Sequence, residues 1–198
     1  MLALPQFSTR IVVGGGSGCV AVVAWVLARS MRGFPNKPHR WLWRLVVRST
    51  ADMRRRDRTA AAWIGVGCWS MGVVVLHVAG LAFEIYPTVP WWDLLTHAAS
   101  GSGVAALALL THRSSVALSD AVWWVVPTVA AIGAGFEVYE FVFKRFWYQW
   151  SLQQYVVDTV VGLGMNTLGA AVAASIASGY RARADHLRPD STAPNSAD

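Results

Sequence analysis

Long apolar stretches, separated by short polar segments, dominate the chain. Five of them hold few charged residues: 11–28, 60–83, 93–110, 121–143 and 155–178. Because about 20 apolar residues in a helix cross the hydrocarbon core of a bilayer, each stretch is long enough to span it. The connections leave no room for a separate soluble domain. We therefore predict an all-α, polytopic transmembrane helical bundle of about five helices, formed by one membrane domain over residues 1–180.

The composition agrees with a membrane protein. Hydrophobic residues make up 55% of the chain and charged residues 14%, and the mean hydropathy is +0.39; soluble domains carry about 25% charged residues. Both cysteines fall within apolar stretches and indicate neither a disulfide framework nor a zinc motif. The alternative for 11–28 is a cleaved signal peptide. Cleavage would place the most basic loop outside the cell, against the usual distribution of positive charge.

The positive charges predict an orientation. Ten of the 17 Lys and Arg residues lie in 29–58. Since cytoplasmic loops of membrane proteins are enriched in Lys and Arg, this basic loop is expected in the cytoplasm. The N-terminus is then outside and the C-terminus inside a multi-pass protein of the cell membrane. Residues 181–198 are expected to form a disordered cytoplasmic tail because they end in small and polar residues.

The basic loop has a pattern of its own. Arg40, Arg44 and Arg48 recur every four residues beside Trp41 and Trp43. This spacing is typical of an interfacial helix, so we expect residues 29–58 to contact anionic lipids of the inner leaflet. The remaining arginines need no nucleic-acid partner, because the positive-inside bias explains them. The sequence leaves the oligomeric state open.

Glycines are concentrated within the apolar stretches. The run Gly14–Gly18 lacks the Lys and Ser or Thr that end a phosphate-binding loop, and it lies in an apolar helix. Small residues allow membrane helices to approach closely. We therefore expect these glycines to pack helices together, as do those of the later stretches: Gly133, Gly135, Gly162, Gly164 and Gly169.

Ionisable residues inside the predicted helices are the main chemical feature. Each costs roughly 3 kcal/mol or more at mid-bilayer, so each needs a reason. The polar residues are His77, Glu84, Asp93, His97, Glu137, Glu140 and Asp158, with the amide Asn166 further along. Spacings of three, four or seven place those of one helix on a shared face. Alternating helix directions put them in the outer half of the membrane, where four helices converge.

Five carboxyl groups in one poorly solvated space require compensation. Some could hold protons, some could pair with His97, Lys144, Arg145 or Arg10, or a cation could bind among them. Histidine with carboxylates suits a divalent transition metal, whereas carboxylates with water suit calcium or magnesium. A divalent metal ion is therefore one hypothesis, with Asp93, His97, Glu137, Glu140 and Asp158 as its ligands.

The same residues support two functional interpretations. In the first, Glu137, Glu140, Asp93, His97 and Asp158 are catalytic or metal-binding residues that act on an envelope or lipid-linked substrate. In the second, the protein is not an enzyme, and the cluster is a structural network or a path for protons or ions. Some members have simpler explanations. Glu84 and Asp93 lie near helix ends and could be solvated, and His77 and Asn166 could join helices.

Three motifs in order, WWDLLTH, FEVYEF and VVDTVVGLGMNTLGA, resemble the YjdF-like family of small membrane proteins. A looser likeness reaches the VanZ-like proteins, which are associated with glycopeptide resistance and the cell envelope. The likeness covers roughly 84–170. It implies that the family-typical positions are Asp93, His97, Glu137, Glu140, Asp158, Thr159 and Asn166. Gly162 departs from the pattern, since the family usually has an acidic residue there. No reaction is implied.

Overall fold

The computed structural model describes residues 4–112, 118–143 and 150–186, and these are helical apart from short turns. The long helices are α1 (Leu4–Ser30), α3 (Arg58–Ala82), α5 (Trp92–His112), α6 (Leu118–Phe143) and α7 (Leu152–His186). Between them lie η1 (Pro38–Arg40), α2 (Trp41–Arg54) and α4 (Ile85–Thr88). Five helices are long and apolar enough to cross a membrane. The predicted all-α bundle with five membrane-spanning helices is confirmed.

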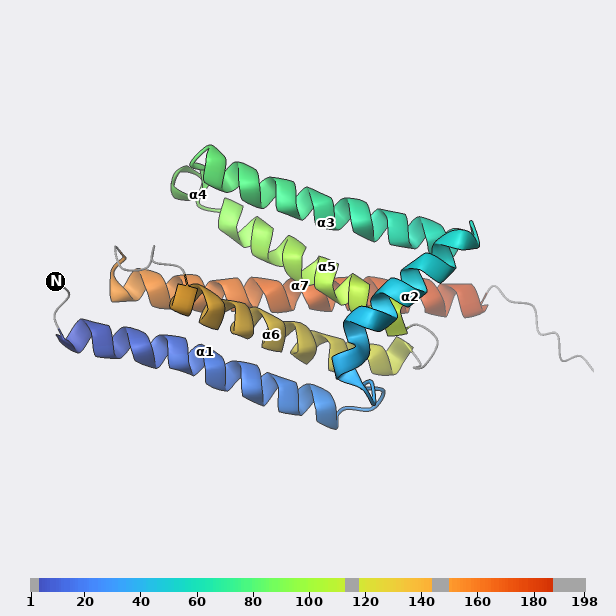
Figure 1. Cartoon of the computed structure of the whole chain (residues 1–198), viewed down its shortest axis with the longest axis horizontal. Coiled ribbons are helices and arrows are strands. Elements are labelled where there is room, and N and C mark those ends of the chain that lie inside the picture. Colours follow the sequence, from blue (N-terminus) through green and yellow to red (C-terminus); the bar gives the residue numbers. More distant parts are fainter. Residues whose placement is uncertain (1–3, 113–117, 144–149, 187–198) are drawn as a thin grey trace, which may run out of the picture.

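The five long helices lie side by side and alternate in direction (Figure 1). α5 and α7 form the most extensive contact, α1 packs on α6, and α6 also packs on α7. α3 lies at the edge of the bundle, against α5. The buried core joins α5, α6 and α7 and is rich in alanine: Ala105, Ala108, Leu109, Trp124, Val125, Val129, Ala170 and Ala174. Small side chains let these helices approach closely.

The crossing of α5 and α7 depends on two glycines. A Cβ atom added at Gly101 would collide with the backbone carbonyl of Asn166, and one added at Gly169 would collide with that of Ala98. At the same crossing, the Ser102 hydroxyl donates a hydrogen bond to the Gly169 carbonyl oxygen over 3.0 Å. The two backbones are therefore in direct contact, as expected for Gly169.

The packing role predicted for the other glycines is confirmed only in part. Cβ atoms at Gly133 and Gly162 would press on side chains of neighbouring helices, and one at Gly14 would press on the Phe141 ring. Gly135 and Gly164 face open space, so the prediction is wrong for those two. The packing prediction is also wrong for Gly15 and Gly16, where nothing lies within 4 Å of an added Cβ atom.

Local sequence signals fix several helix ends. The Asp57 carboxylate caps α3 by accepting from the Thr59 and Ala60 backbone N–H groups over 2.8 and 3.2 Å. α7 begins with a reciprocal capping pair, because the Ser151 N–H donates to Gln154 Oε1 and the Gln154 N–H donates to Ser151 Oγ. At the far end of α3, Glu84 has a φ of 52°, in the left-handed region that ends helices.

The helix expected within the basic loop is present, and the predicted C-terminal boundary changes. The basic loop 29–58 contains α2, which crosses the bundle at the end remote from the N-terminus (Figure 1). Asp52 near the end of α2 is buried and accepts a hydrogen bond of 3.1 Å from Trp63 Nε1 of α3. At the C-terminus, α7 continues to His186, so 181–186 is helical rather than disordered. Alternating Arg and Ala are strong helix formers, and no proline stops them before 189. Residues 187–198 lie outside the described part.

Candidate functional site

Polar residues of three long helices gather at one end of the bundle, which we call the carboxylate end. It carries Asp93 and His97 in the first turns of α5, Glu137 and Glu140 in the last turns of α6, and Asp158 and Thr159 near the start of α7. These turns coincide because successive helices run in opposite directions, and the N-terminus lies at the same end (Figure 1). The structure thus brings together the residues of α5, α6 and α7 that the sequence singles out.

His97 lies between a carboxylate and an amide. Its Nε2 is 3.5 Å from Asp93 Oδ1, and its Nδ1 is 3.0 Å from Asn166 Nδ2 of α7. The His97 side chain is 16% exposed and the Asp93 side chain 33%. These contacts form a line, Asp93–His97–Asn166, that leads from a buried amide through the imidazole to a partly exposed carboxylate.

The donor at Asn166 decides which nitrogen of His97 carries hydrogen. An amide nitrogen can only donate, so His97 Nδ1 must accept. The neutral ring then has its hydrogen on Nε2, and Nε2 faces Asp93. A proton gained or lost at Asp93 is thus next to an imidazole N–H, which is an arrangement suited to proton transfer.

Gly162 provides the space for the His97 ring. A Cβ atom at Gly162 would lie 2.9 Å from Cε1 and 3.0 Å from Nε2 of His97. One turn further along α7, Asn166 fits against Gly133 of α6, where a Cβ atom would lie 3.2 Å from Asn166 Nδ2. A larger side chain at position 162 would need the space that the imidazole fills.

Glu137 is the most deeply placed carboxyl group of the set. It is 4% exposed and accepts a hydrogen bond of 3.2 Å from Thr159 Oγ1 of α7. Glu140, Asp158 and Asp93 all lie within electrostatic reach of it. A buried carboxyl group in an apolar span is costly without such a partner. Its position requires both the α6–α7 contact and the Thr159 hydroxyl.

Tyr86 is a member of the cluster that sequence reasoning missed. It lies in α4, outside the membrane-spanning helices, and its hydroxyl is 2.7 Å from His77 Nδ1. Burial raises the pKa of Tyr86, a hydrogen bond to Thr96 lowers it, and the charges of Asp93 and Glu140 raise it further. His77 of α3 therefore contacts a phenol that lies within electrostatic reach of Asp93 and Glu140. None of the sequence patterns singles out Tyr86.

Glu84 does not join this set in the structure. Its side chain is exposed in the turn between α3 and α4, and its backbone is at positive φ. The spacing of seven between His77 and Glu84 suggested one helix face, but α3 ends at Ala82. Lys144 and Arg145, which were considered as counter-charges, lie outside the described residues.

The donor set does not fit the predicted divalent metal. Among residues 4–112, 118–143 and 150–186, no group of three or more His, Cys, Asp or Glu side chains is placed to hold an ion. The reason is visible at His97, whose Nδ1 accepts from Asn166 and whose Nε2 faces a single carboxylate. Glu137 is engaged by Thr159. The geometry describes a hydrogen-bonded acid and imidazole network instead.

Comparison with known proteins identifies a family but no activity. No curated protein and no solved structure matches the chain. A family described as predicted membrane protein (DUF2238) matches residues 18–183, which cover α1 from Gly18 onward, all of α2 to α6, and α7 as far as Arg183. The match includes every residue of the carboxylate end. The chain belongs to the DUF2238 family of predicted membrane proteins.

Proposed function

We propose that the carboxylate end is an acid–base site that acts on the polar head of a lipid or lipid-linked envelope substrate. The observation that carries the proposal is the line Asp93–His97–Asn166, in which a partly exposed carboxylate faces an imidazole N–H held in place by a buried amide. In acid–base sites, the tautomer of a histidine is typically fixed by a hydrogen bond to the ring nitrogen that faces away from the reacting group.

Each residue has a role in this proposal. Asp93 exchanges a proton with the substrate, because its side chain is the more exposed of the pair. His97 is the adjacent donor and acceptor, and Asn166 is a positioning residue. Glu137 with Thr159, and Glu140 beside Tyr86, supply further polar groups on the α6 side of the site. No metal is part of the proposal.

The location of the site in the cell is also part of the proposal. With ten Lys and Arg residues in 29–58 facing the cytoplasm, the carboxylate end lies in the outer half of the cell membrane and the N-terminus is outside. The looser resemblance to VanZ-like proteins, which are associated with the cell envelope, supports an envelope role. That site would meet substrates in the outer leaflet.

We also propose that α2 contacts anionic lipids of the inner leaflet. Leu42, Trp43 and Val46 leave an exposed apolar surface on this helix, and exposed arginines follow at 54–56. An apolar face next to positive charge is typical of helices that lie in the membrane surface. The position of α2 across the bundle fits this arrangement (Figure 1).

A structural network is the second candidate function, because the polar contacts join different helices. His97 and Asn166 link α5 to α7, Glu137 and Thr159 link α6 to α7, and His77 and Tyr86 link α3 to α4. Interhelical hydrogen bonds in membranes contribute about 0.6 kcal/mol on average, which is enough to set helix register when several act together. In this alternative the cluster holds the helices and does no chemistry.

The two candidates differ in what a conservative change does. We expect Asp93→Asn to preserve folding, since Asn is isosteric and the Asp93 side chain is one-third exposed, while abolishing the acid–base step. Membrane lipids from cells that lack the protein are compared by mass spectrometry with those from cells producing the wild type, Asp93→Asn or Glu84→Gln. Glu84 is exposed outside the cluster and serves as the control.

The acid–base proposal requires a lipid species whose abundance changes with the wild type and Glu84→Gln but not with Asp93→Asn, at equal protein levels. Identical lipid profiles with all three proteins would contradict it. A large loss of thermal stability in Asp93→Asn would favour the structural network.

A further inference from the structure

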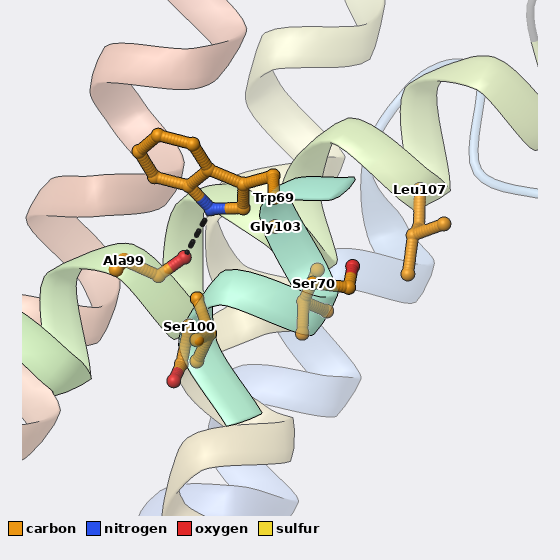
Figure 2. A pocket seen from close by; sticks show the side chains of 8 residues that line it. Trp69, Ser70, Ala99, Ser100, Gly103 and Leu107 are labelled. Carbon is orange, nitrogen blue, oxygen red and sulfur yellow. Dashed lines mark hydrogen bonds between the residues drawn. The ribbon is translucent and has the colours of Figure 1, made fainter. Parts of the chain in front are cut away.

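A groove between α3 and α5 begins where the carboxylate end stops. Figure 2 shows its walls, with Trp69, Ser70 and Val73 from α3, and residues from Ala99 to Leu107 from α5. The volume is about 190 Å³, and the groove is open along one side rather than enclosed. For scale, an engineered apolar cavity of about 150 Å³ binds benzene.

The groove is continuous with the polar cluster along both helices. On α3, Val73 is one turn from His77, and on α5, Ser100 is one turn from Thr96 and bonds to its carbonyl oxygen over 2.7 Å. Residues at these spacings lie on one helix face. Asp93 is three residues before Thr96, so a molecule whose polar end met His77 and Asp93 would extend into the groove.

The depth of the groove matches the centre of a bilayer. At 1.5 Å per residue, Ala99 lies roughly 10 Å and Leu107 roughly 22 Å along α5 from Trp92, and the hydrocarbon core is about 30 Å thick. The groove therefore runs from below the polar end to past the middle of the membrane. Lipid chains occupy this depth range.

The walls suit an apolar occupant. The lining is predominantly apolar, and two of the polar side chains on it, Trp69 and Ser100, already have partners within the protein. The Trp69 indole N–H donates to the Ala99 carbonyl oxygen over 2.9 Å, and the Ser100 hydroxyl donates to its own helix. The Trp69 bond, drawn in Figure 2, also ties the two walls together. A bound molecule therefore needs no hydrogen-bonding atoms to pair with Trp69 or Ser100.

Size distinguishes a hydrocarbon chain from a helix of a second copy. A helical segment 12 Å long and about 10 Å across occupies on the order of 900 Å³, which is more than the groove can hold. A helix could only cover the groove, whereas an extended hydrocarbon chain can enter it. Entry from the side is open because α3 is at the edge of the bundle and its outer face, with Val74 and Val78, is exposed.

We propose that the α3–α5 groove binds the hydrocarbon chain of the lipid-linked substrate whose polar head reacts at the carboxylate end. This inference rests on the proposed function and adds the substrate class: an amphiphile with a chain that reaches mid-bilayer. Trp69 and Val73 are specificity-determining residues, and they are separate from the groups that handle protons.

Neighbouring valines provide a matched pair of variants. Val73→Phe places a larger side chain in the groove, whereas Val74→Phe makes the same change on the exposed face of α3. Each protein is reconstituted in vesicles that contain a phospholipid with a diazirine at the middle of one acyl chain. After photolysis, labelled positions are mapped by peptide mass spectrometry. Ser70→Leu fills the same groove and replaces Val73→Phe if that variant does not fold.

We expect strong labelling of groove residues in the wild type and Val74→Phe, and a severalfold loss of that labelling in Val73→Phe and Ser70→Leu. Labelling of exposed Met71 and Val75 serves as the internal reference for bulk lipid. Groove labelling no stronger than this reference, or unchanged in the filled variants, would overturn the inference. Cross-linking between groove residues of two copies of the chain, with loss of groove labelling in the cross-linked pair, would also overturn it.

The acid–base variant separates this inference from the proposed function. Asp93→Asn leaves the groove intact, so it should keep full groove labelling. If lipid profiles show no dependence on Asp93 while Val73→Phe still loses labelling, the chain groove stands and the acid–base function fails. If lipid profiles depend on Asp93 while Val73→Phe labels like the wild type, the groove assignment alone fails.

Discussion

Replacing Gly169 with alanine is expected to lower the free energy of unfolding by about 3 kcal/mol, at the upper end of overpacking effects. The added Cβ atom would overlap the backbone carbonyl of Ala98, and a backbone cannot move aside as a side chain can. α5 and α7 would have to separate, with loss of the Ser102 hydrogen bond to Gly169. Thermal unfolding of the purified protein in detergent measures the change.

Gly164→Ala is the matched control for this prediction. Gly164 lies in the same helix, and nothing lies within 4 Å of a Cβ atom added there. Both variants gain the same intrinsic helix preference of alanine over glycine, about 1 kcal/mol. The difference between them therefore reports the α5–α7 contact. If the two variants unfolded at the same temperature, the close crossing would be wrong.

Replacing Gly162 with alanine is expected to displace the His97 ring and to remove the activity proposed for the carboxylate end. The new Cβ atom would come within 3.0 Å of the imidazole, so the ring must shift from its position between Asp93 and Asn166. Because a side chain rather than a backbone yields, the cost in stability is smaller, about 1–2 kcal/mol. The lipid profile and thermal unfolding are measured together.

Gly164→Ala is also the control for Gly162→Ala, because it distinguishes an effect on the site from an effect on the stability of the fold. Gly164→Ala should keep the lipid profile of the wild type and lose no stability, because its added methyl group touches neither His97 nor another helix. A Gly162→Ala protein with a wild-type lipid profile would show that the position of His97 is unimportant. The acid–base proposal would then lose its main support.

Much of the fold could be predicted from hydropathy because membrane-spanning helices need long apolar stretches, and the chain has five. The gathering of Asp93, Glu137 and Asp158 at one end could also be predicted, since each lies near a helix terminus and successive helices are antiparallel. The length of the apolar stretches determines the five-helix bundle, and the alternating direction of the helices determines the shared end of the polar residues. No knowledge of side-chain packing is needed for them.

The contacts within the site could not be predicted in this way. Spacing alone cannot tell which glycine faces a neighbour, so Gly162 and Gly164 look equivalent although only Gly162 touches His97. Tyr86 joins the cluster because α3 ends at Ala82 and the chain turns back through α4, and this depends on the positive φ of Glu84. The absence of a three-ligand metal group in the described residues likewise depends on which partner each side chain has found.

The tautomer of His97 tests the central claim most directly, since the proposed site requires a neutral imidazole with its hydrogen on Nε2 and Nδ1 accepting from Asn166. Nitrogen-15 NMR of protein labelled at histidine distinguishes the two ring nitrogens, and His97→Gln assigns the signal. We predict a protonated Nε2 and an unprotonated Nδ1, with a change at Nδ1 in Asn166→Leu. A hydrogen on Nδ1, or a spectrum unaffected by Asn166→Leu, would contradict the Asp93–His97–Asn166 line.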